Sequence, residues 1–238
     1  MLKSAINRIL ELAAPTTYEI EGEHFASERL HRIDPKKNVP TAITVNGLDS
    51  VCKLVRNEAA AIGRKLFIQI ADYRNVKVFS TYDKDFERCT LYNCAADTPQ
   101  ICMGSYMNYE RAVVELRSLY IPNEGTNYLL SLLASITQES KVTSTDNGVT
   151  QKVEAKTGIA LNQLVEIRPR VNLQPFRTFV EVLQPESEFL LRINDDGCIG
   201  LFPADGGVWK LEATRNVAAY FEEHLKDLIG EGKIVVIR

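Results

Sequence analysis

Two apolar runs joined by a short polar connection constrain the fold of this chain more than any other feature. The stretch KLFIQIADYRNVKVFSTYD, residues 65–83, places alternating apolar side chains on both sides of Tyr73-Arg74-Asn75. A period of two is typical of β-strands, and two such runs around a short polar connection predict a strand pair. The run CTLYNCAA, residues 89–96, predicts a third strand. The middle of the chain therefore contains a sheet.

Helices and further strands are predicted on both sides of this sheet. Apolar residues recur with helical spacing at 2–13, 48–55, 108–120, 126–137 and 208–228. Further strands are predicted at 165–173, 176–183, 187–193, 198–202 and 233–238. The mixture indicates an α+β fold. We expect an N-terminal α/β part with a small sheet and helices at 1–138. The region 139–238 is then mainly antiparallel sheet with a projecting hairpin and a long helix, although one compact unit is also compatible with the pattern.

Composition and charge exclude several classes of protein. The formal charge of −3 argues against a protein that mainly grips nucleic-acid backbone, because that affinity comes from Lys and Arg. No apolar run approaches the length of a membrane span, and charged residues interrupt the apolar N-terminus, so we expect a cytoplasmic protein. Five cysteines at irregular spacing and three histidines predict reduced thiols, with no metal site and no cofactor.

A polar hairpin is predicted around Asn147-Gly148, a dipeptide typical of two-residue turns. Counting outward from that turn pairs Val142 with Val153. Thr, Ser, Gln and Lys dominate both faces of the two strands, and such a hairpin cannot be a core element. We expect it to extend into solvent or to mediate self-association, together with the short amphipathic helix at the N-terminus.

The stretch PADGGVWKLEATRN, residues 203–216, opens the helix that carries the only tryptophan of the chain. Glycine-rich stretches before helices can bind phosphate, but this one matches neither common phosphate-loop pattern. Asp205 is placed to cap the helix, and Gly206 and Gly207 can adopt positive φ. The sequence favours a structural turn, and an anion or ligand site is the alternative.

Charged residues alternate with apolar ones in QPFRTFVEVLQPESEFLLRI, residues 174–193. As a strand, this stretch would place Arg177 and Glu181 on one face, where they could pair. A solvated sheet face explains the pattern, and so does a polar cleft in which Arg177 or Arg192 recognises a carboxylate or phosphate.

A basic segment and the absence of catalytic motifs complete the survey of sites. The basic segment is predicted to be a solvated loop, and a nucleic-acid or anionic-ligand patch is the alternative: Arg29, His31, Arg32, Lys36 and Lys37. No nucleophile motif and no distinctive pair of acids is recognisable, so no catalytic residue is predicted.

The C-terminal hundred residues resemble a family encoded by bacteriophages. DNGVTQKVEAKTGIA, QPFRTFVEVLQPESEFLLRI and LFPADGGVWKLEATRNVAAYFEE are similar to the C-terminal half of the YfdQ-like prophage proteins, over roughly residues 138–238. The resemblance implies a phage or prophage protein encoded near recombination and replication genes, and it transfers no catalytic residue.

These observations together favour a non-enzymatic, homo-oligomeric phage accessory protein. Support of phage DNA metabolism, through DNA or a recombination protein, is the leading expectation. One alternative is an anti-defence protein that sequesters a small anionic nucleotide, and another is an enzyme that acts on nucleotides.

Overall fold

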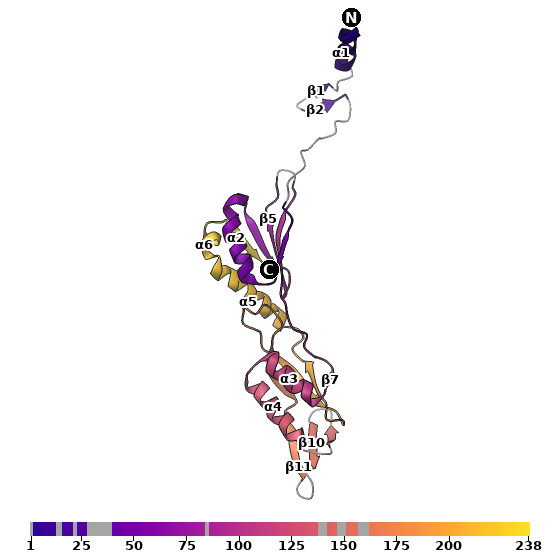
Figure 1. Cartoon of the computed structure of the whole chain (residues 1–238), viewed down its shortest axis with the longest axis vertical. Helices are drawn as coiled ribbons and strands as arrows, with labels where there is room; N and C mark the ends of the chain where they lie inside the picture. The colour runs from indigo at the N-terminus through magenta and orange to yellow at the C-terminus, as the bar shows by residue number, and fades with distance from the viewer. Residues whose placement is uncertain are drawn as a thin grey trace. The chain divides into compact units, whose positions relative to one another are not determined.

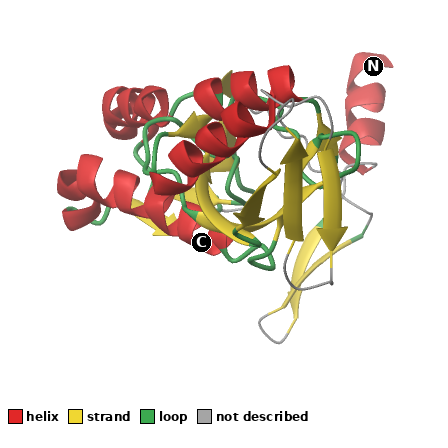
Figure 2. Ribbon diagram, turned by 90° about the horizontal axis from the view of Figure 1, so that it is seen from below, coloured by secondary structure: helices red, strands yellow, loops and turns green. Residues whose placement is uncertain are grey.

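The computed structural model of the chain describes residues 2–12, 16–20, 23–27, 40–83, 86–137, 142–146, 151–156 and 162–238. The chain forms two compact units, Met1–Val39 and Pro40–Arg238. Figure 1 shows its helices and strands, and Figure 2 shows them coloured by type. The α+β class predicted from the sequence is confirmed, with two mainly antiparallel five-stranded sheets in the larger unit.

The smaller unit contains one helix and one hairpin among its described residues. Helix α1 (Leu2–Leu12) is amphipathic, and its residues from Lys3 to Ile9 are exposed. Strands β1 (Thr17–Ile20) and β2 (Glu23–Ala26) form an antiparallel hairpin in which Ile20 lies opposite Glu23. Exposure of Ile6 and Ile9 leaves an apolar helix face in contact with water.

The first sheet of the larger unit has the order β15-β4-β5-β6-β3. Strands β4 (Leu66–Ile70), β5 (Asn75–Ser80) and β6 (Thr90–Ala95) form an antiparallel meander that matches the predicted strands. The edges are β3 (Ile43–Val45), parallel to β6, and β15 (Ile234–Ile237), parallel to β4. Parallel neighbours need crossover connections, and helical segments lie in both connections here.

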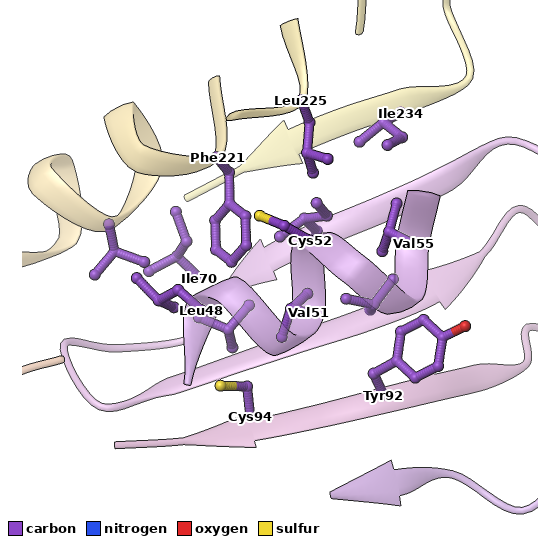
Figure 3. Packing of buried hydrophobic residues seen from close by; sticks show 14 of the residues in the cluster. Leu48, Val51, Cys52, Val55, Ile70, Tyr92, Cys94, Phe221, Leu225 and Ile234 are labelled. Atoms are coloured by element: carbon purple, nitrogen blue, oxygen red, sulfur yellow. The ribbon is translucent and has the colours of Figure 1, made fainter. Parts of the chain in front are cut away.

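Three helices pack on one face of this sheet, as Figure 1 shows: α2 (Leu48–Ile62), α5 (Trp209–His224) and α6 (Lys226–Gly230). Leu66, Ile68 and Ile70 alternate toward that face and are buried. Figure 3 shows the resulting core, in which Phe221 of α5 lies close to Cys52 of α2. Burial raises the pKa of the Cys52 thiol to about 11, and Asp49 contributes. This core encloses apolar and thiol side chains.

The second sheet is antiparallel throughout and has the order β7-β14-β13-β12-β8. Its strands are β7 (Tyr106–Met107), β14 (Ile199–Pro203), β13 (Ser187–Ile193), β12 (Arg170–Pro175) and β8 (Tyr120–Ile121). Helices α3 (Tyr109–Ser118) and α4 (Glu124–Thr137) share its core. Gly125 approaches β12 so closely that a Cβ atom would lie 2.1 Å from the Asn172 carbonyl oxygen. Only glycine fits there without a backbone shift.

Each core draws on residues from both sides of residue 138, the position at which the sequence suggested a boundary. Strand β15 closes the first sheet beside β4, and β7 and β8 flank strands of the second sheet. A division near residue 138 would cut both sheets. The structure instead divides the chain between Val39 and Pro40. Residues 40–138 and 139–238 belong to one unit because long-range strand pairing, which local patterns do not reveal, joins them.

The polar hairpin is part of a separate three-stranded sheet with the order β11-β10-β9. Strands β9 (Val142–Asp146) and β10 (Gln151–Lys156) pair Val142 with Ala155 and Val153 with Ser144. The predicted pairing of Val142 with Val153 is therefore wrong. Residues 147–150 separate the strands, and a four-residue connection shifts the register by two. Strand β11 (Asn162–Ile167) pairs with β10 and places Val165 opposite Val153.

Three other predicted elements differ from the structure. The strand predicted at 165–173 is interrupted at Arg168 and Pro169, between β11 and β12. The helix predicted at 208–228 is broken at Leu225 into α5 and α6. Residues 176–183 form a compact turn-containing segment and no strand.

Candidate functional site

The connection between β4 and β5 is held in place by Asp72. Its carboxylate accepts hydrogen bonds from the backbone N–H groups of Arg74 (2.7 Å) and Asn75 (2.9 Å) and from the Asn75 side-chain amide. Burial opposes ionisation of Asp72, but these hydrogen bonds outweigh it and hold its pKa below the ordinary value. The turn therefore presents Tyr73 and Arg74 in a defined conformation.

Gln184 organises the segment 176–186 from the inside. Its buried side chain accepts hydrogen bonds from the backbone N–H groups of Arg177 (2.9 Å) and Thr178 (3.1 Å). Its amide nitrogen donates to the carbonyl oxygens of Phe179 (2.8 Å) and Val182 (3.3 Å). One side chain thus satisfies four backbone groups that neither sheet pairs. These hydrogen bonds are the physical reason why 176–183 is not a strand.

The segment 176–186 is also joined to the β4–β5 connection. The hydroxyl group of Thr178 donates to the Tyr73 carbonyl oxygen, and Arg74 Nε donates to the Arg177 carbonyl oxygen at 3.4 Å. Two stretches that lie about a hundred residues apart in the sequence therefore meet at one place. Their contact brings Arg74 and Arg177 together.

Arg177 is a charged residue with only 4% of its surface exposed. Its guanidinium carbon lies 3.8 Å from the centre of the Trp209 ring, and one terminal nitrogen donates to the Ser187 hydroxyl and the Pro185 carbonyl. Burial lowers the pKa of Arg177 to about 10, although Asp205 opposes the shift. Its Nε is buried and has no hydrogen-bond partner among the described residues. An unpaired buried N–H costs roughly 1–3 kcal/mol.

The turn that precedes α5 has the structural role predicted from the sequence. The Asp205 carboxylate accepts hydrogen bonds from the backbone N–H groups of Gly207 (3.1 Å) and Trp209 (3.3 Å), and Gly206 and Gly207 adopt φ values of 62° and 82°. The N–H groups of Val208 and Lys210 donate to carbonyls of the same turn. A phosphate loop would leave such amides available to the ligand. An anion at this place would have to be bound by side chains.

These segments together line an open cleft of about 600 Å³. Its charged lining residues among those described are Arg74, Arg177, Lys210 and Asp205, so three cations face one carboxylate. Tyr73 packs edge-on against Trp209 with ring centres 4.6 Å apart, and Lys210 Nζ lies 5.6 Å from the Tyr73 ring centre. Further lining residues are Thr98, Pro99, Gln100, Ile101, Met103, Pro203, Gly206 and Gly207. The cleft combines cationic groups with an apolar wall.

Four of the residues singled out in the sequence line this cleft, namely Arg177, Asp205, Gly206 and Gly207. Glu181 does not share a face with Arg177. Its Oε1 accepts a hydrogen bond from the Leu48 N–H at 2.8 Å, at the start of α2. The predicted pairing of Arg177 with Glu181 is wrong because the segment 176–186 is a turn. Arg192 lies on β13, opposite Gly200 of β14, and does not line the cleft.

The remaining sequence predictions fall partly outside the described residues. Val142 and Val153 lie on β9 and β10, whereas Asn147 and Gly148 are not described. The basic segment also lies outside the described residues, so its role stays a prediction: Arg29, His31, Arg32, Lys36 and Lys37.

The sequence pattern indicates no binding role for Tyr73, Arg74, Lys210 or Gln184. It identifies Tyr73 and Arg74 only as part of a connection between strands. Loop residues that contribute to function are often held by a rigid scaffold, and the Asp72 and Asn75 pair was a signal of such a loop. No local pattern indicates that this loop meets the segment 176–186.

A second hollow of about 370 Å³ lies beside α4 and β12. It contains two arginines as well, but each pairs with a carboxylate: Arg168 with Glu124 at 3.0 Å and Arg170 with Glu188 at 2.5 Å. Arg168 also lies 4.8 Å from the centre of the Tyr128 ring. The cations of this hollow are already neutralised.

Comparison of the chain with protein-family models, curated proteins and solved structures finds no match. The prophage resemblance therefore stays a prediction. Within the described part of the chain, no group of three His, Cys, Asp or Glu side chains is arranged to hold a metal ion. No helix in that part has the length and apolar character needed to cross a membrane.

Proposed function

We propose that this protein binds a small anionic ligand of the nucleotide class in the Arg177 cleft, and that it does so without chemical conversion. The observation that carries the proposal is the charge balance of the cleft. In the described part of the chain, three cations face one carboxylate, and the buried Arg177 Nε has no hydrogen-bond partner. Arginine and lysine recognise phosphate groups well, and arginine does so with directional hydrogen bonds.

The size and lining of the cleft favour a nucleotide over a bare anion. A volume of about 600 Å³ lies in the range typical of small-molecule sites. Pro99, Ile101 and Met103 provide apolar surface beside the cations, which suits a base or a sugar ring. A nucleotide carries both kinds of group, whereas inorganic phosphate would leave the apolar wall unused.

The polar groups of the cleft favour binding over catalysis. Each oxygen of the Asp205 carboxylate accepts a hydrogen bond from a backbone amide, which fixes the carboxylate in the turn. Arg177 is fixed by Ser187 and Trp209. These fixed groups are suited to holding a ligand in one pose.

Incubation of the purified protein with AMP, ATP, adenosine and pyrophosphate, followed by denaturation and mass spectrometry, tests this proposal. We expect recovery of unaltered nucleotide and little adenosine. Lys210→Met and Arg74→Met, both at exposed side chains, should weaken the binding of nucleotide, and Arg170→Met in the second hollow should not. Recovery of a converted nucleotide would support the enzyme alternative, and failure of every probe to bind would overturn the proposal.

We also propose that the protein self-associates through α1 and the sheet β9–β11. The support is the exposed apolar face of α1, with Ile6 at 48% and Ile9 at 65% exposure. An isolated helix of this length is marginal in water without a partner surface. Light scattering coupled to size-exclusion chromatography tests this, and a strict monomer at micromolar concentration would contradict it.

The prophage resemblance gives both proposals a biological setting in the host cytoplasm. A phage protein that holds a nucleotide without converting it would act by sequestering a nucleotide signal of host defence. Support of phage DNA metabolism would require a second surface, because the Arg177 cleft has the size of a small-molecule site.

A further inference from the structure

The sheet β15-β4-β5-β6-β3 carries aromatic side chains on the face opposite its helices. Leu66, Ile68 and Ile70 of β4 point toward the helices, so Phe67, between them, points the other way. Phe67 lies opposite Phe79 on β5 and opposite Val235 on β15. These three side chains are partly exposed and belong to neither hydrophobic core.

A continuous row of rings begins at this pair, and we define the aromatic row as Phe67, Phe79, Tyr82, Phe86 and Arg88. The rings of Phe67 and Phe79 stack with centres 5.5 Å apart. The Arg88 guanidinium lies 5.4 Å from each of these centres and 5.8 Å from the Tyr82 ring. Tyr82 stacks in turn on Phe86 at 5.5 Å. Four rings and one guanidinium thus extend from the sheet onto the β5–β6 connection.

The outer end of the row is held out into solvent. Phe86 is 81% exposed and Tyr82 is 57% exposed. Phe86 has a φ of 60°, a conformation that bulky side chains rarely adopt. Hydrogen bonds between Phe86 N and Asp83 O (3.0 Å) and between Asp83 N and Glu87 O (2.9 Å) hold the turn in this conformation. A strained turn that exposes a phenyl ring indicates a surface built for contact.

The charges on this face indicate the kind of partner. Arg88 has no carboxylate within ion-pair distance among the described residues. Lys77 lies two residues before Phe79 on the same face of β5 and is exposed. The described acids beside the row are Asp83 and Glu87, and Asp83 also accepts the Glu87 N–H within the turn. An apolar protein partner would leave Arg88 buried without a counter-ion, whereas a phosphate would neutralise it.

We propose that this face binds single-stranded nucleic acid. Bases stack on the exposed rings of Phe86 and Tyr82, and phosphates lie beside Arg88 and Lys77. Stacking on aromatic side chains and on arginine planes is a general way in which sheets bind unpaired bases. Because stacking supplies much of the affinity, a net charge of −3 is compatible with such a surface. This site is separate from the Arg177 cleft, and the proposal does not depend on nucleotide binding there.

Fluorescence anisotropy of labelled single strands of about twelve nucleotides tests the proposal on the full-length protein. Oligothymidylate and oligouridylate are titrated at about 50 and about 200 mM salt. Phe86→Ala and Tyr82→Ala should each weaken binding by at least about fivefold. Arg88→Gln should weaken binding and reduce the slope of log affinity against log salt by about 0.7. These side chains are exposed, so the variants should fold.

Tyr106→Ala is the matched control. Tyr106 is also an exposed tyrosine, at 47%, and it packs on Phe202 within the other five-stranded sheet. The Tyr106→Ala variant should bind oligothymidylate and oligouridylate as tightly as the unchanged protein does. Binding of either strand chemistry that depends on the aromatic row supports the proposal. Absence of binding at the lower salt, equal binding of duplex, or equal loss in Tyr106→Ala would overturn it. A change of oligomeric state in Phe86→Ala with no change in nucleic-acid binding would show that a second copy covers this face.

Discussion

The two hollows of the larger unit contain similar residues in opposite electrostatic states. Arg168 and Arg170 pair with Glu124 and Glu188 in the hollow beside α4, and these ion pairs are largely exposed. Arg177, in the other hollow, is buried against Trp209 and has hydroxyl and carbonyl partners, and its Nε–H has no partner among the residues that the structure describes. The number of arginines in a hollow therefore does not identify it as a binding site. The distinguishing property is whether carboxylates already neutralise the charge of these arginines.

The largest expected effect comes from the residue that positions Arg177. Gln184→Ala removes the acceptor for two buried N–H groups and the donor for two carbonyls. We expect the free energy of unfolding to fall by roughly 4 kcal/mol, since each buried unpaired group costs about 1–3 kcal/mol. Urea unfolding monitored by circular dichroism measures this loss. A loss below about 1 kcal/mol would show that the segment does not depend on Gln184.

The second hollow has a structural contact of its own at Gly125. Gly125→Ala would place a methyl group 2.1 Å from the Asn172 carbonyl oxygen. Overpacking against backbone should destabilise the protein by about 3 kcal/mol. The same unfolding experiment tests this, with Gly230→Ala as control because a Cβ atom there meets nothing within 4 Å. Equal stability of the two variants would contradict the account.

A smaller loss is expected at the cap of α5. Asp205→Ala removes hydrogen bonds to Gly207 and Trp209. Loss of such a cap costs about 1 kcal/mol, which thermal unfolding should detect as a modest decrease in melting temperature. Asp205→Asn keeps an acceptor oxygen and should retain part of this stability.

Removal of the carboxylate charge in Asp205→Asn should also strengthen anion binding in the cleft. Weaker anion binding by this variant would show that the carboxylate contacts the ligand.

The smallest effect is expected in the second hollow, at the ion pair between Arg170 and Glu188. The two side chains are 58% and 36% exposed. Exposed pairs contribute about 0–1 kcal/mol, so Arg170→Met should unfold at nearly the same urea concentration as the unchanged protein. A large loss would mean that this hollow is held together by its charges.

Local patterns predicted the elements of this fold well and their assembly poorly. The strands β4, β5 and β6 and the buried face of α2 follow from short-range periodicity, and all were recognisable in the sequence. Polar and apolar residues alternate in the segment 176–183 as they do in a strand. The Gln184 side chain, however, hydrogen-bonds backbone groups of this segment, which forms a turn. A side chain that makes the backbone hydrogen bonds a neighbouring strand would make leaves no periodic pattern in the sequence.

The candidate site could be predicted only in part, for the same reason. A turn is predicted from the residue types alone at Asp205, Gly206 and Gly207. The φ values of the two glycines and the hydrogen bond of Asp205 agree with that prediction. Arg177 was recognised as an unusual charge, but its neighbours Tyr73 and Arg74 lie about a hundred residues away. Contacts between distant segments depend on tertiary packing, which a single sequence does not specify.

The most direct test of the central claim is a titration of ATP that follows the side-chain Nε–H resonances of arginine in the intact protein. The Arg177 resonance is assigned by its absence in Arg177→Met, and those of Arg168 and Arg170 by the corresponding variants. We predict that ATP shifts the Arg177 resonance and leaves those of Arg168 and Arg170 in place. Shifts confined to Arg168 and Arg170, or no shift at Arg177 at saturating ATP, would contradict the claim that the unneutralised hollow is the binding site.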